Sequence, residues 1–169
     1  SRRMWVRTTR TFEAHSIVFR ARRDSEDAGS EVGLAFNWDG NLGTSGSGEP
    51  LNGYRLSWAV WENPSKLKIT RYDNWVNTDL NSIEFPPDNN EHEFAILIED
   101  GVIRVFVDGV QMLQANDSTY TSGYIGLTAT QGSTDANRRG RYNWIVVNGT
   151  KKEKVLMPTP LRETSSQKI

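Results

Sequence analysis

The sequence predicts an all-β protein, an antiparallel β-sandwich of jelly-roll type, on three observations. About ten short runs rich in β-branched and aromatic residues are separated by Gly, Asn, Asp and Pro. No segment shows a convincing helical period. Two Asp-Gly pairs, Asp100-Gly101 and Asp108-Gly109, lie between apolar runs, where glycine supplies the positive φ that tight hairpin turns need. Many short strands joined by such turns are typical of sandwiches and jelly rolls.

The first strands are expected where apolar and polar side chains alternate. Trp5–Phe12, rich in Thr and Arg, reads as an edge strand, and Ile17–Arg22 follows it. In Val32–Phe36 large apolar residues alternate with small ones, so one face of the strand is large and apolar and the other is small. The small face leaves room for another part of the molecule or a ligand to approach closely. Residues 39–53 are rich in Gly, Ser and Asn and are expected to form a long loop, a kind of segment that often carries function.

The middle strands are expected on both sides of short turns. Tyr54–Trp61 and Lys66–Tyr72 alternate, with Asn63-Pro64-Ser65 between them. Residues 73–77 look like a connection that exposes a tryptophan, and Leu80–Phe85 is a short strand stopped by two prolines.

The two Asp-Gly turns make the next segments a meander of antiparallel strands. Its runs are Phe94–Ile98 and Val102–Val107, and later strands are expected at Gly123–Leu127 and Tyr142–Val147. We find no repeat and no second core, so residues 1–150 are predicted to form a single β-sandwich domain. Residues 151–169 read as a C-terminal extension or linker.

Composition excludes several classes of function. The 169 residues include no cysteine, which rules out disulfides, thiolate catalysis and zinc-thiolate sites. Lys and Arg number 20 against 21 Asp and Glu, so nothing in the net charge of −1 points to nucleic acid as a partner. No apolar run reaches the roughly 20 residues of a membrane span. The start, SRRMWV, lacks both an initiating Met and a signal peptide and is interpreted as part of a longer polypeptide.

Several segments resemble the concanavalin A-like lectin/glucanase jelly rolls. They are IVFRA at 17–21, GYRL at 53–56, KLKI at 66–69, VFVDG at 105–109 and DSTYTSGYIGL at 117–127. Within that superfamily the chain looks most like the laminin-G-like and carbohydrate-binding-module branch, which includes modules attached to fructan-degrading enzymes. The resemblance implies two curved sheets, with sugar bound on the concave face or at rim loops. It implies no certain cofactor; some members hold a structural calcium near the terminal strands, where an acidic residue is common and Asn143 stands here.

Sugar binding needs flat apolar faces for C–H groups and planar polar side chains for paired hydroxyls. We expect Trp38, Trp61 and Trp75 to be exposed at strand ends or in loops, and Trp58 and Trp144 to be core. Each of Trp38, Trp61 and Trp75 is as readily explained by packing under a loop as by stacking on a ligand. The predicted carbohydrate-binding residues are Arg20, Asn37, Trp38, Asp39, Trp61, Arg71, Trp75 and Arg104.

No catalytic residue is predicted. Retaining glycosidases of this superfamily commonly carry an E-x-D-x-x-E-type strand motif, and it does not occur here. Glu26, Asp27 and Glu31 are expected on a solvated surface, and two histidines are too few for a persuasive metal site or triad.

The sequence thus favours a non-catalytic, lectin-like module of a larger extracellular or cell-surface protein, whose partner is a polysaccharide or other glycan. Two alternatives remain open. One is a laminin-G-type domain that binds a protein, and the other is a glycoside hydrolase or polysaccharide lyase of the same fold.

Overall fold

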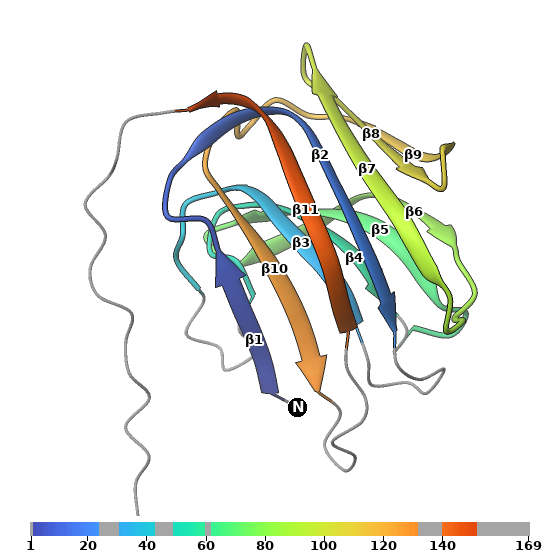
Figure 1. The fold of residues 1–169 in the computed structure, drawn as a ribbon. Helices are drawn as coiled ribbons and strands as arrows, with labels where there is room; N and C mark the ends of the chain where they lie inside the picture. Colours follow the sequence, from blue (N-terminus) through green and yellow to red (C-terminus); the bar gives the residue numbers. More distant parts are fainter. Residues whose placement is uncertain (1, 24–30, 43–48, 60–61, 132–139, 152–169) are drawn as a thin grey trace, which may run out of the picture.

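In the computed structural model the protein is a sandwich of two antiparallel sheets (Figure 1). The structure describes residues 2–23, 31–42, 49–59, 62–131 and 140–151. These residues form eleven strands: β1 (Arg2–Arg7), β2 (Phe12–Arg23), β3 (Glu31–Trp38), β4 (Gly53–Ala59), β5 (Lys66–Asp73), β6 (Val76–Glu84), β7 (Glu91–Glu99), β8 (Val102–Val107), β9 (Val110–Asn116), β10 (Tyr124–Gln131) and β11 (Gly140–Lys151). The predicted fold class, an all-β jelly-roll sandwich, is confirmed.

One sheet has six strands in the order β1-β10-β3-β4-β5-β6, and the other has five in the order β11-β2-β7-β8-β9. The inward faces of the two sheets enclose one main core. Its large buried side chains include Ile17, Phe19, Leu34, Phe36, Leu56, Trp58, Ile69, Phe94, Ile96, Ile103 and Val105. Burying each of these side chains contributes about 1.5–3 kcal/mol relative to leaving it in water, which holds the sheets together.

Three hairpins have two-residue turns with positive φ at both turn positions, the geometry that type I′ turns require. Asp100-Gly101 joins β7 to β8, Asp108-Gly109 joins β8 to β9, and Asn74-Trp75 joins β5 to β6. The first two confirm the predicted Asp-Gly turns. The third was not predicted, because a tryptophan stands where glycine is preferred.

Several predicted strands have different limits in the structure. Trp5–Phe12 is not one strand: β1 ends at Arg7 and β2 begins at Phe12. The backbone N–H of Thr8 bonds to Ile125 and its side chain to the Arg10 carbonyl, so the chain turns there and passes to the other sheet. Leu80–Phe85 is the second half of the longer β6. The predicted extension 151–169 lies, beyond Lys151, outside the described residues.

Trp58 is buried as predicted, but the prediction that Trp144 is core is wrong, because its exposed fraction is 37%. β11 has an irregular register between Tyr142 and Trp144, which leaves Asn143 without a partner in β2. An extra residue in one strand reverses the alternation of faces. Tyr142 therefore points into the core, where its hydroxyl reaches the carbonyl oxygen of Gly33 at 2.7 Å, and Trp144 points outward.

The expectation that Glu31 is solvated is also wrong. Glu31 is fully buried and forms an ion pair with Arg55, which is itself buried. Arg55 also lies 2.5 Å from Glu49, which accepts a hydrogen bond from Tyr72 at 3.1 Å. Charges removed from water need such partners, because an unpaired buried charge is strongly destabilising. Glu26 and Asp27 lie outside the described residues.

His92 contacts Asp108 in the β8–β9 turn, Asp88 in the segment before β7, and Trp58 in the core. Its Nδ1 lies 2.6 Å from Asp108 and its Nε2 lies 3.0 Å from Asp88, while its ring meets Trp58 edge to face. Burial alone lowers the pKa of His92, but the hydrogen bonds and charges of Asp108 and Asp88 outweigh it and raise that pKa above 6.5. Burial also opposes ionisation of both aspartates, and the bonds to His92 nevertheless hold their pKa values below 3.8.

We expect the stability of the protein to depend on His92 in a defined pH window. Because its pKa is raised on folding, the stabilisation is complete below pH 6.5 and is lost as the pH rises through the folded-state pKa. His92→Gln should flatten this slope, and His15→Gln, at an exposed position, should leave it unchanged. Urea unfolding between pH 5 and 9 is the measurement, and an unchanged slope in His92→Gln would contradict the assignment.

Candidate functional site

Polar side chains from three connections meet at one end of the sandwich. These are the β3–β4 loop, the β5–β6 turn, and the segment between β9 and β10. Backbone bonds hold the first two together, since Asn74 N–H donates to Asn52 Oδ1 at 2.8 Å and Trp75 N–H donates to the Leu51 carbonyl at 3.1 Å. We call the group the rim cluster; its members are Asp39, Asn52, Arg71, Asp73, Asp117 and Tyr120.

Asp117 joins the two sheets within this cluster. It follows β9 of the five-stranded sheet and accepts a hydrogen bond from the hydroxyl of Tyr54, on β4 of the six-stranded sheet, at 2.5 Å. It also pairs with Arg71 from β5 and accepts from the backbone of Thr119 at 3.0 Å. The bond from Thr119 closes a local turn at Asp117. With a side chain only 7% exposed, Asp117 is held in one orientation.

Asp73 is the second carboxylate at the centre of the cluster. It accepts from the Arg71 Nε at 2.7 Å and from the Tyr120 hydroxyl at 2.6 Å. Asn52 extends the network, because its amide donates to Asp39 at 2.9 Å. The cluster therefore alternates carboxylates with groups that donate to them, and each planar side chain is oriented by its neighbours.

Trp75 stands beside the rim cluster, with an exposed fraction of 37% and a φ of 75°. A left-handed backbone costs an L-residue roughly 1–2 kcal/mol, and bulky residues rarely adopt it outside functional sites. The other two hairpins of this geometry carry glycine at the same position, Gly101 and Gly109. The chain thus holds a large aromatic ring at the surface at an energetic cost.

The pKa values of the carboxylates and tyrosines in and beside the cluster determine which of these groups are charged. The hydrogen bond from Tyr120 and the pairing with Arg71 hold the pKa of Asp73 below 3.8. Burial opposes ionisation of Asp117, but bonds from Tyr54, Thr119 and Arg71 lower its pKa as well. Burial and the bond to Asp73 raise the pKa of Tyr120 to about 12, and burial raises that of Tyr54 further. At neutral pH both carboxylates are ionised and both hydroxyls are protonated donors.

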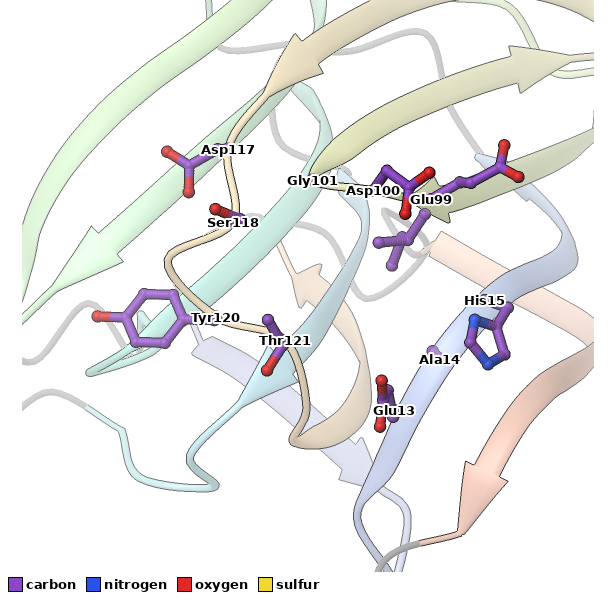
Figure 2. A pocket seen from close by; sticks show the side chains of 11 residues that line it. Glu13, Ala14, His15, Glu99, Asp100, Gly101, Asp117, Ser118, Tyr120 and Thr121 are labelled. Carbon is purple, nitrogen blue, oxygen red and sulfur yellow. The ribbon is translucent and has the colours of Figure 1, made fainter.

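An open depression of about 430 Å³ adjoins the cluster (Figure 2). It is lined by the start of β2, the β7–β8 turn and the segment 117–121, with Glu13, His15, Glu99 and Asp100 among its polar side chains. Figure 2 shows the Asp117 and Tyr120 side chains directed away from Glu13 and His15. The polar groups therefore do not converge on the depression, and the rim cluster is the better-organised site. Among the described residues no group of three or more His, Cys, Asp or Glu could hold a metal ion.

The structure brings four of the predicted binding residues to this end. Asp39 and Arg71 belong to the rim cluster, and Trp75 lies beside it, exposed as predicted. Asn37 is buried behind the cluster and donates to the carbonyl of Tyr120 at 2.8 Å. Trp61 lies outside the described residues.

The expectation that Trp38 is exposed is wrong. Its exposed fraction is 2%, because Tyr124 packs against it, the Arg7 guanidinium lies 5.9 Å from its ring, and its indole donates to the Asn41 carbonyl at 2.6 Å. Trp38 therefore has no free face for a sugar.

Arg20 and Arg104 lie away from the rim cluster. Their strand neighbours, Phe19 and Val105, are in the core, so both arginines occupy the outward face of the five-stranded sheet. Arg20 lies 3.2 Å from Glu93 and over the ring of Trp144, and Arg104 lies 3.8 Å from Glu99.

Sequence reasoning missed Tyr54, Asn52, Asp73 and Tyr120 as members of the site. Tyr54 lies in a strand predicted only by its alternation; its ring is buried in the core, and its hydroxyl reaches Asp117. The sequence does show that Asn, Asp and Tyr are frequent near the ends of the predicted strands. That pattern does not predict which of these side chains contact one another in the folded protein.

The fold defines the structural class of the chain: it is an antiparallel jelly-roll sandwich, similar in fold to the concanavalin A-like lectins and glucanases. No protein-family model matches the sequence, and no curated protein matches it. Among solved structures it is similar to the carbohydrate-binding module CBM66 from Bacillus subtilis, with a TM-score of 0.61, 15% identity, and coverage of 89% of this chain and 82% of that one.

Two further solved structures of this fold are similar. A β-glucanase from Bacillus licheniformis gives a TM-score of 0.61 at 15% identity over 85% of this chain and 70% of that one. A protein of unknown function with a galectin-like fold, from Bacillus subtilis, gives a TM-score of 0.62 at 17% identity over 89% of this chain and 79% of that one. At these identities the likeness establishes the fold, and the site has to be argued from its own residues.

The hydrogen bond between Tyr54 and Asp117 is expected to stabilise the fold. Tyr54→Phe should cost about 1–3 kcal/mol, because it leaves a nearly buried carboxylate without one of its donors. Tyr124→Phe is the matched control, since the buried Tyr124 hydroxyl has no hydrogen-bond partner among the described residues. Urea unfolding at pH 7 measures both, and equal effects of the two variants would contradict this role of Asp117.

Proposed function

We propose that the protein is a non-catalytic, lectin-like carbohydrate-binding module. The observation that carries the proposal is Trp75, which is exposed in a left-handed backbone conformation beside a preorganised polar cluster. Aromatic rings stack on the C–H faces of sugars, and rigid planar polar groups bind hydroxyls in pairs. The similarity in fold to a carbohydrate-binding module supports the proposal.

In this mechanism the Trp75 indole supplies the apolar platform. Hydroxyls of the same sugar donate to carboxylate oxygens of Asp73 and Asp39, whose positions are fixed by Tyr120 and Asn52. Arg71 is already oriented by its bonds to Asp73 and Asp117, so little side-chain entropy is lost on binding.

The protonation states support binding rather than catalysis at this cluster. A glycoside hydrolase needs one carboxylic acid with a raised pKa as proton donor, whereas the pKa values of Asp73 and Asp117 are lowered. A lyase that uses tyrosine as base needs a lowered tyrosine pKa, whereas those of Tyr54 and Tyr120 are raised. We further propose that the module belongs to a larger extracellular or cell-surface polypeptide, where polysaccharides are accessible.

Trp75→Ala should weaken glycan binding by about fivefold or more. Trp144→Ala is the matched control, because both side chains are 37% exposed and only Trp75 adjoins the cluster. Stacking on one aromatic ring is worth roughly 1 kcal/mol or more, so its loss is measurable. The measurement is affinity electrophoresis against soluble polysaccharides, confirmed by calorimetry, with calcium and with a chelator.

Equal binding by wild type and Trp75→Ala would move the site elsewhere on the molecule. Release of reducing sugar or unsaturated product would establish an enzyme instead. If the protein bound no polysaccharide but captured a protein partner regardless of added sugar, the laminin-G-type interpretation would replace the present one.

A further inference from the structure

The charges at the rim cluster do not balance. The cluster contains three carboxylates, those of Asp39, Asp73 and Asp117, and one cation, Arg71, which gives it a net charge of 1 − 3 = −2. Asp73 and Asp117 stay ionised at neutral pH because hydrogen bonds lower their pKa values. Exposure keeps two of these charges effective toward a ligand, because the side chain of Asp73 is partly exposed and Asp39 is an exposed residue.

The neighbouring surface adds charge of the same sign. The depression beside Asp117 carries Glu13, Glu99 and Asp100, and its one basic residue is His15. Arg104 lies 3.8 Å from Glu99, too far for a tight pair. The Arg7 guanidinium, which donates to the Gly40 carbonyl next to Asp39, offsets one of these negative charges. The acidic groups still outnumber the basic ones, so a polymer that extends from Trp75 over this end of the sandwich meets a negative field.

The hydrogen-bond directions favour the same kind of ligand. Tyr54, Tyr120 and Asn52 donate to carboxylates of the cluster, so these donors are already engaged. The carboxylate lone pairs that remain are acceptors, and they need donors from the ligand. Sugar hydroxyls donate, whereas sulfate and carboxylate groups only accept.

We infer that the rim cluster selects neutral glycans and rejects anionic ones such as polyuronates and sulfated polysaccharides. Asp39 and Asp73 are the residues that determine this selectivity, by repulsion of acidic groups as well as by accepting from hydroxyls. The inference rests on the proposed glycan site and adds the chemical class of its ligand.

The first experiment compares the intact wild-type chain against two sets of soluble polymers. The neutral set is barley β-glucan, laminarin, inulin and xyloglucan, and the anionic set is alginate, polygalacturonate and heparin. We expect binding to at least one neutral polymer, insensitive to salt between 20 and 300 mM, and much weaker binding to every polymer of the anionic set at both salt concentrations.

The second experiment removes the charges while keeping the shapes. Asp39→Asn and Asp73→Asn retain a carbonyl oxygen that accepts the bonds from Asn52 and Tyr120. We expect each to weaken neutral binding and, at 20 mM salt, to raise affinity for alginate by about fivefold, an effect that screening removes at 300 mM. Glu84→Gln is the control, because this exposed residue ends β6 at the opposite end of the strand from Trp75.

The outcomes separate the two proposals. No binding to any polymer overturns the glycan-binding function itself. Binding to an anionic polymer as tight as to a neutral one, weakened in Trp75→Ala, leaves the glycan site standing and overturns the selectivity. Affinity for alginate that rises equally in Glu84→Gln would assign the effect to net charge and also overturn the role of Asp39 and Asp73.

Discussion

The carboxylate of Asp117 is the point on which the arrangement of the functional end depends. It follows the last strand of the meander in one sheet, and its partners Tyr54 and Arg71 belong to the other sheet. Because this carboxylate is nearly buried and ionised, it has to be satisfied by these donors. Satisfying it fixes Arg71, which fixes Asp73 and, through Tyr120 and Asn52, the remaining polar groups. The hydrophobic core brings the sheets together, and Asp117 sets how their ends face each other.

The Asp117 side chain is nearly buried and stabilises the fold, whereas Trp75 is exposed and its backbone conformation is strained. The other two hairpin turns place glycine, which adopts positive φ without steric cost, at their second position, whereas Asn74-Trp75 places a bulky residue there. Backbone bonds from Asn74 and Trp75 to the β3–β4 loop hold the turn in place. The strain is thus offset by the neighbouring loop, and the ring remains available to a ligand.

Electrostatics distinguishes the two buried or half-buried networks of the molecule. At Glu31, Arg55 and Glu49 the charges are paired beneath the surface, where they stabilise one packing of the six-stranded sheet. At the rim cluster three carboxylates surround a single guanidinium, and the excess charge faces solvent. The first network lies beneath the surface and contributes to the fold, whereas the second presents its excess charge to solvent, where we propose that it acts on the choice of ligand.

The sequence by itself determined the class of fold, the Asp-Gly hairpins and the exposed Trp75, because each depends on local alternation or on the φ that one residue can adopt. It determined the rim only in part: Asp39 and Arg71 were predicted, whereas Tyr54, Asp73 and Asn52 were not, since they meet through partners far away in the chain. Tertiary structure alone decided that Trp38 is covered by Arg7 and Tyr124, and that an irregular register at Asn143 turns Trp144 outward. Alternation along a strand is a local property, whereas what covers a strand end and where a register shifts depend on packing between segments distant in sequence.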